Sequence, residues 1–160
     1  MRNRTALVAV LLALLALPLL AAAQDRLARF EGGIGVVPVR LAGTTAVPNT
    51  VRGTNPGGQP WVIARLSADV RADGRISVDG RGLLLGGGDA IGTTNNVSVR
   101  ARFFCGLVGF DSAAAVPLEA NGDFRIEGEL VGTPPAACAN PVLLIISTGG
   151  NWFAAGIPKL

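Results

Sequence analysis

The chain has 160 residues, a length that suits one domain with its own buried core. It contains no histidine and no tyrosine, and its single lysine is Lys159, so the composition excludes Ser-His-Asp and Cys-His catalysis and argues against Ser-Lys or Schiff-base chemistry. The formal net charge is +3, from 14 basic and 11 acidic residues, and this balance does not indicate nucleic acid as a partner.

A predicted signal peptide over residues 1–23 opens the chain. Two arginines precede an unbroken apolar run from Ala6 to Leu20, and three alanines follow before Gln24, as in a cleavable secretory signal. We expect cleavage before Gln24 and export to the periplasm or the cell exterior, with residues 24–160 forming a single all-β domain. The exported chain keeps twelve basic and eleven acidic residues and has no later apolar run of membrane-spanning length.

Few strand signals precede Trp61. Residues Ile34 to Val39 predict a strand, and Pro38 places it at a sheet edge because proline has no N–H to donate to a neighbour. The stretch from Leu41 to Pro60 is rich in threonine, glycine, proline and asparagine, which is typical of a long loop. We expect at most one short strand in it, at Thr50 to Arg52.

Alternation of apolar and polar residues is clearest in the two segments that flank residues 72–74. The pattern predicts two strands that each turn one face to a core and the other to water. A two-residue turn would set apolar Val70 opposite Ser77, whereas a three-residue loop sets it opposite Ile76. Because a slip of one residue reverses both faces, we predict the three-residue loop, with Gly74 at positive φ. The other apolar pairs in this register are Ala68 with Val78 and Val62 with Leu84.

The second half of the chain continues these strand signals. Residues 120–122 repeat the three-residue loop and predict a second hairpin, with Leu118 opposite Phe124 and Val116 opposite Ile126. Further strands are predicted at residues 97–105, 142–146 and 152–157, with loops at 86–96 and 106–115. We therefore predict an all-β fold of about eight antiparallel strands, either an antiparallel β-sandwich or a small β-barrel.

Cys105 and Cys138 are the two cysteines of the chain, so a single intramolecular pairing exists. In an exported chain this predicts a structural disulfide. Their spacing does not match a Cys-x-x-Cys redox motif, and two thiols without histidine make a poor metal site. We expect neither a metal nor another cofactor.

The polar face of the first hairpin carries the binding candidates. Four arginines form two cross-strand pairs on it: Arg65, Arg71, Arg75 and Arg81. Like charges directly opposite each other are unfavourable, so this face is a candidate site for an acidic cell-envelope glycan. The alternative is a solvated face that Asp69 and Asp79 screen. Trp61 and Trp152 are candidates for stacking on sugar rings, or else core-edge residues at strand starts.

Glu127 and Glu129 lie two residues apart and hence on one face of a predicted strand. A pair of carboxylates supplies the acid and the base or nucleophile of a glycoside hydrolase. The alternation of the strand equally explains both residues as parts of a polar outer face. A small carboxylate-dependent glycoside hydrolase is therefore the alternative function.

Several short motifs resemble a small family of exported bacterial proteins. They are Phe30-Glu31-Gly32-Gly33-Ile34-Gly35, Gln59-Pro60-Trp61-Val62-Ile63, Asn121-Gly122-Asp123-Phe124-Arg125-Ile126 and Trp152-Phe153-Ala154-Ala155-Gly156-Ile157-Pro158. The resemblance implies an exported single domain and carries no activity, ligand or site residue. We predict an exported, non-enzymatic β-domain that binds or assembles, with a cell-envelope glycan, an apolar small molecule or another protein as its partner.

Overall fold

The computed structural model of the protein describes residues 26–159. The predicted signal peptide over residues 1–23 lies outside these described residues. Within them the chain forms thirteen strands and no helix, which confirms the all-β prediction. The described part of the chain accordingly contains no helix long and apolar enough to cross a membrane.

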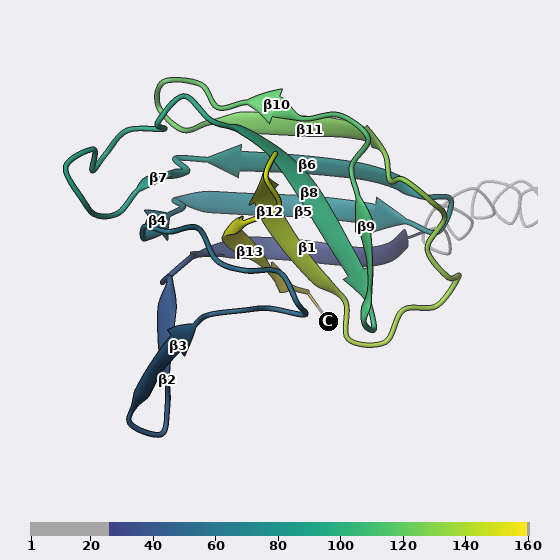
Figure 1. The fold of residues 1–160 in the computed structure, drawn as a ribbon. Helices are drawn as coiled ribbons and strands as arrows, with labels where there is room; N and C mark the ends of the chain where they lie inside the picture. Colours follow the sequence, from purple (N-terminus) through teal and green to yellow (C-terminus); the bar gives the residue numbers. More distant parts are fainter. Residues whose placement is uncertain (1–25, 160) are drawn as a thin grey trace, which may run out of the picture.

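One antiparallel sheet dominates the molecule and curls on itself like half of a barrel (Figure 1). Its strands follow the order β10-β8-β12-β13-β1-β5-β6-β11, and β9 pairs with β8 beside β10. An isolated bridge between Ser112 and Leu130 joins the segments that follow β9 and β11, so the two ends of the sheet meet there. The bounds are β1 Arg26–Gly35, β5 Arg65–Arg71, β6 Arg75–Arg81, β8 Ser98–Cys105, β9 Val108–Asp111, β10 Val116–Pro117, β11 Phe124–Glu129, β12 Val142–Ser147 and β13 Trp152–Pro158.

The β5–β6 hairpin has the predicted register. Val70 lies opposite Ile76 and Ala68 opposite Val78, and Gly74 closes the three-residue loop at φ +90°. The alternation places every second side chain of both strands in the core and the others toward water. The predicted pair of Val62 and Leu84 also forms, but in a separate small sheet of β4 (Trp61–Val62) and β7 (Leu84–Leu85).

The second predicted hairpin forms only at its turn. Gly122 adopts φ +82°, and the Glu119 N–H donates to the Asp123 carbonyl oxygen at 2.9 Å. Beyond this turn the prediction was wrong, because Val116 pairs with Val99 of β8 and not with Ile126. The tight turn at residues 106–107 folds β9 and then β10 back along β8, so β10 takes β8 as its partner. The prediction missed this return because it interpreted residues 106–115 as a loop.

The first strand was predicted in the wrong place. Residues 26–35 form β1 in the middle of the sheet, between β13 and β5, in place of an edge strand at Ile34–Val39. The glycines of β1 interrupt the alternation of apolar and polar residues by which a strand is recognised. They also allow close packing, because a Cβ on Gly35 would lie 2.0 Å from the Trp61 carbonyl oxygen. Gly32, at φ +91°, lies in the irregularity of the β1–β13 register.

Two predicted loops contain strands. Part of the stretch from Leu41 to Pro60 belongs to a hairpin of β2 (Val39–Ala42) and β3 (Thr45–Pro48), and residues 106–115 contain β9. Gly43, at φ +63°, occupies the first position of the two-residue β2–β3 turn, where a type II′ turn needs positive φ. Thr50–Arg52 is not a strand; Val51 instead makes an isolated bridge to Thr54.

The core lies inside the curl. Phe30 and Phe103 meet edge to face there with ring centroids 6.4 Å apart, and both side chains are fully buried. β12 lies between β8 and β13 and is buried on both faces from Leu143 to Ile146, as the apolar run predicted. The predicted disulfide between Cys105 and Cys138 is confirmed, at the edge of this core.

Candidate functional sites

The four candidate arginines lie at the two ends of the β5–β6 hairpin. Arg65 is directly opposite Arg81, and Arg71 and Arg75 flank the loop at residues 72–74. Carboxylates compensate two of the four: Arg81 contacts Asp79 and Asp123, each at 3.0 Å, and Arg75 contacts Asp73 at 2.6 Å. Much of the positive charge on this face is therefore balanced locally.

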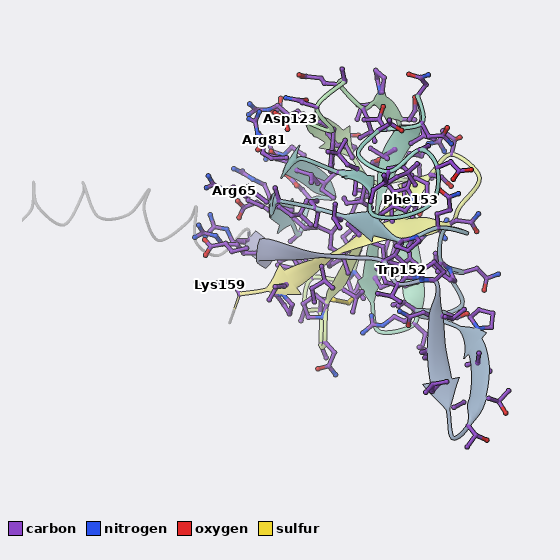
Figure 2. All side chains as sticks on the ribbon, turned by 90° about the vertical axis from the view of Figure 1, so that its left-hand side faces the viewer. Arg65, Arg81, Asp123, Trp152, Phe153 and Lys159 are labelled. Atoms are coloured by element: carbon purple, nitrogen blue, oxygen red, sulfur yellow. A yellow bond between two sulfur atoms is a disulfide. The ribbon has the colours of Figure 1, made fainter. Side chains whose placement is uncertain are left out.

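Asp123 fastens the turn after β10 to the end of β6. Its carboxylate accepts hydrogen bonds from Arg81 and from the Gly82 N–H, both at 3.0 Å, and Figure 2 shows Arg81 beside it. The hydrogen bond from Arg81, followed by that from Gly82, holds the pKa of Asp123 below its ordinary value. This part of the Asn-Gly-Asp-Phe motif therefore has a structural role.

A shallow depression of about 590 Å³ brings the two sets of charged candidates together. Arg71, Arg75, Glu127 and Glu129 all line it. Glu127 is exposed and contacts Arg125 at 2.7 Å. Both carboxylates lie on one strand and face solvent, whereas the pair in a glycosidase flanks a bound sugar from two sides.

Both tryptophans are buried. Trp61 stacks on Phe153 with ring centroids 4.2 Å apart, and Trp152 donates from Nε1 to the Asn49 carbonyl oxygen at 2.9 Å. Each keeps about a twentieth of its surface or less. Neither ring has a face open to a sugar in this arrangement, so sugar stacking finds no support and the core-edge interpretation fits both.

The β2–β3 hairpin, residues 39–48, projects from the body of the molecule as an arm (Figure 1). Cross-strand pairing places Val39 with Pro48 and Leu41 with Ala46 on one face of the arm. This face is wholly apolar, yet Val39 is 57% and Leu41 is 71% exposed. A two-stranded hairpin is at best marginally stable alone in water, so the uncovered face is a candidate contact surface. Sequence analysis missed it because glycine and proline suggested a loop.

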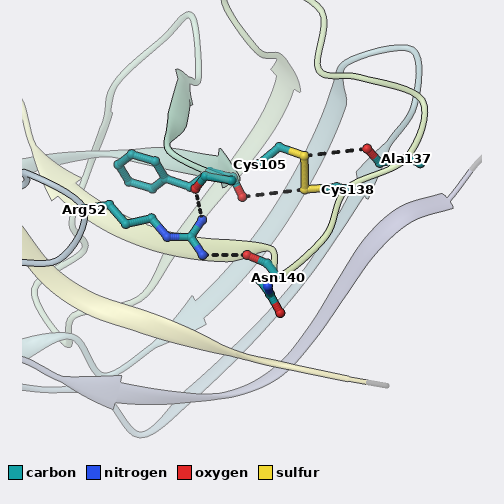
Figure 3. Close-up of a disulfide and its surroundings, with 7 residues drawn as sticks. Arg52, Cys105, Ala137, Cys138 and Asn140 are labelled. Atoms are coloured by element: carbon teal, nitrogen blue, oxygen red, sulfur yellow. Dashed lines mark hydrogen bonds between the residues drawn. A yellow bond between two sulfur atoms is a disulfide. The ribbon is translucent and has the colours of Figure 1, made fainter.

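Arg52 connects three segments next to the disulfide (Figure 3). Its guanidinium group donates to the carbonyl oxygens of Gly106 and, at 2.6 Å, of Asn140, and it lies 5.7 Å from the ring centroid of Phe104. Gly106 follows Cys105 directly and Asn140 comes two residues after Cys138. The disulfide thus holds both acceptors of Arg52 in place. The sequence Arg52-Gly53 could have indicated a turn, but nothing in the sequence indicated that Arg52 contacts Gly106 and Asn140.

No family model, curated protein or solved structure matches the chain. Within residues 26–159, no group of three or more histidine, cysteine, aspartate or glutamate side chains is arranged to hold a metal ion.

Proposed function

We propose that this chain is an exported, non-enzymatic binding domain that docks a protein through the arm at residues 39–48. The observation that carries the proposal is the exposed apolar face of the arm, which combines Val39 and Leu41 with Ala46 and Pro48. The disulfide is in keeping with an oxidising compartment, as the predicted signal peptide requires.

The arm also indicates the chemistry of its partner. Arg40 lies on the face opposite to Leu41, and among residues 26–159 no carboxylate lies within ion-pair distance of it. A partner groove with apolar walls and an acidic side chain at its rim would complement both faces. A glycan fits less well, because the arm has no aromatic ring on which a sugar stacks.

A photo-crosslinker placed at two positions in the exporting cell tests the proposal. Leu41 and Leu107 are both exposed leucines, at 71% and 86%, but only Leu41 lies on the arm, so Leu107 is the matched control. Benzoylphenylalanine at position 41 is expected to give one defined protein adduct that Arg40→Glu weakens. Position 107 is expected to give none.

Three results would contradict this function. They are no adduct at position 41, the same adduct at both positions, or an adduct whose mass is twice that of the chain. The last result would replace the external partner with a second copy of the protein.

A further inference from the structure

A second depression, of about 540 Å³, collects three guanidinium groups from two separate parts of the chain. Arg100 and Arg102 come from β8, on the side opposite to its buried Val99 and Ala101, and Arg52 comes from the turn at residues 51–54. Such a gathering of like charges is unfavourable unless each charge is compensated. The compensation of the three arginines is unequal.

Arg102 is fully engaged by the protein. It forms a two-pronged ion pair with Asp111 of β9, at 2.5 and 2.7 Å, and donates from Nη1 to the Thr54 hydroxyl at 3.3 Å. The hydrogen bonds that Arg102 donates to Asp111 raise the pKa of Arg102 despite its partial burial. Arg102 therefore ties β8 to β9 and to the turn at Thr54, and Asp111 balances its charge.

Arg52 is held in place without a neutralising carboxylate. Its partners among the described residues are two carbonyl oxygens and the Phe104 ring. Arg52 and Gly53 both adopt positive φ, at 46° and 78°, as the central residues of a type I′ turn that Val51 and Thr54 close. Asparagine is the preferred residue at the first of these positions, so the turn itself does not require arginine there.

Arg100 is the group that lacks a partner. Its Nε atom is shielded from solvent and donates no hydrogen bond to any of residues 26–159. Leaving a charged donor shielded and unsatisfied is costly, and native structures almost always supply an acceptor. The ion pairs of the described chain include none to Arg100 or Arg52.

We propose that this depression is a binding site for an oxyanion, a carboxylate, phosphate or sulfate group. Asp111 balances one of the three guanidinium charges, so a ligand would meet two uncompensated positive charges. An oxyanion in the depression would neutralise the Arg100 guanidinium group that lines it, and the planar fork of a guanidinium group matches the oxygens of such an anion. The disulfide fixes Arg52 beforehand, which lowers the entropic cost of binding. This site is separate from the arm and does not depend on the proposed function.

Titration with inorganic phosphate at constant ionic strength tests the site, with the mature full-length chain as the sample. The side-chain Nε–H resonance of Arg100 in a nitrogen–proton correlation spectrum is expected to shift and saturate. Arg100→Gln is expected to weaken binding about tenfold or more, since a hydrogen bond to a charged group contributes on that scale. Arg52→Asn, which suits the turn, should also weaken binding, whereas Arg40→Gln on the arm should not.

A galacturonate oligosaccharide in place of phosphate distinguishes the source of the anion. Tighter binding of the oligosaccharide identifies a carboxylate on a glycan chain, and equal or weaker binding identifies a free ion; both support the site. Equal phosphate affinity in the native chain, Arg100→Gln and Arg52→Asn overturns it. So does an Arg100 resonance that does not move in the native chain, a measurement that needs no variant to fold.

Discussion

Replacing Cys105 and Cys138 together by alanine is expected to lower the free energy of unfolding by about 4 kcal/mol. The two cysteines are separated by 33 residues, and cross-linking a loop of that length removes about 12 cal/mol/K of entropy from the unfolded chain. At 25 °C this corresponds to about 3.7 kcal/mol. The bridge also holds the segments that contain Gly106 and Asn140 at Arg52, so its loss should loosen that contact as well.

Urea unfolding, followed by tryptophan fluorescence, is a suitable assay, because both Trp61 and Trp152 are buried in the native state. With a slope of about 2 kcal/mol per molar urea, the midpoint should fall by about 2 M. The native chain with its disulfide reduced is the matched control and should unfold close to the alanine variant. A loss below about 1 kcal/mol in both samples would refute the reasoning, because the unfolded chain would then gain little freedom from the missing bridge.

Two further predictions concern packing and acid stability. Gly80→Ala should destabilise the protein by about 1–3 kcal/mol, because the new Cβ would lie 2.1 Å from the Phe124 ring. The control is Gly58→Ala, where a Cβ meets nothing within 4 Å, and it should change the melting temperature little. Equal shifts in melting temperature for the two variants would contradict this packing. Asp123 has a folded-state pKa below its ordinary value, so its contribution to stability is complete above that ordinary value and is lost as the pH falls through the folded pKa. Thermal melts between pH 7 and pH 2 should therefore show a shallower acid loss for Asp123→Asn than for the native chain, and identical slopes would show that the Arg81–Asp123 pair does not act in this way.

The β5–β6 hairpin could be predicted from sequence because its information is local. Alternation defines the two faces, and the three-residue loop with Gly74 at its end permits one register in which Val70 meets Ile76. The burial of β12 could likewise be predicted from its continuous apolar run. In both elements the residues that decide the structure are neighbours along the chain.

β1 and the arm escaped prediction for different reasons. In β1, glycines stand where side chains would show the alternation of a strand. Their role is to let another backbone approach closely, as Trp61 does at Gly35, and this approach exists only in the folded chain. In the arm, a glycine turn and a proline suggested a loop, although Val39–Ala42 and Thr45–Pro48 pair in register. The exposure of its apolar face follows from the projection of the arm away from the body of the molecule, which the sequence does not specify.

The candidate sites divide in the same way. The sequence placed Arg65 opposite Arg81 correctly, but it did not reveal that Asp123 contacts Arg81 from the turn before β11. Nor did it indicate the depression at Arg100, whose walls come from residues about 50 positions apart in the chain. Charge compensation depends on distances between side chains, and those distances exist only in the folded protein.

By itself, the sequence determined the all-β fold class, the β5–β6 hairpin with its register, the apolar strand β12 and the pairing of the two cysteines. Each of these follows from a repeat of two residues, a turn of defined length, a continuous apolar run or the presence of only two cysteines. Only the tertiary structure decided the strand order, the partner of β10, the projection of the arm and the gathering of Arg52, Arg100 and Arg102. These features depend on how the folded segments pack against one another, and no local pattern specifies which segments will meet.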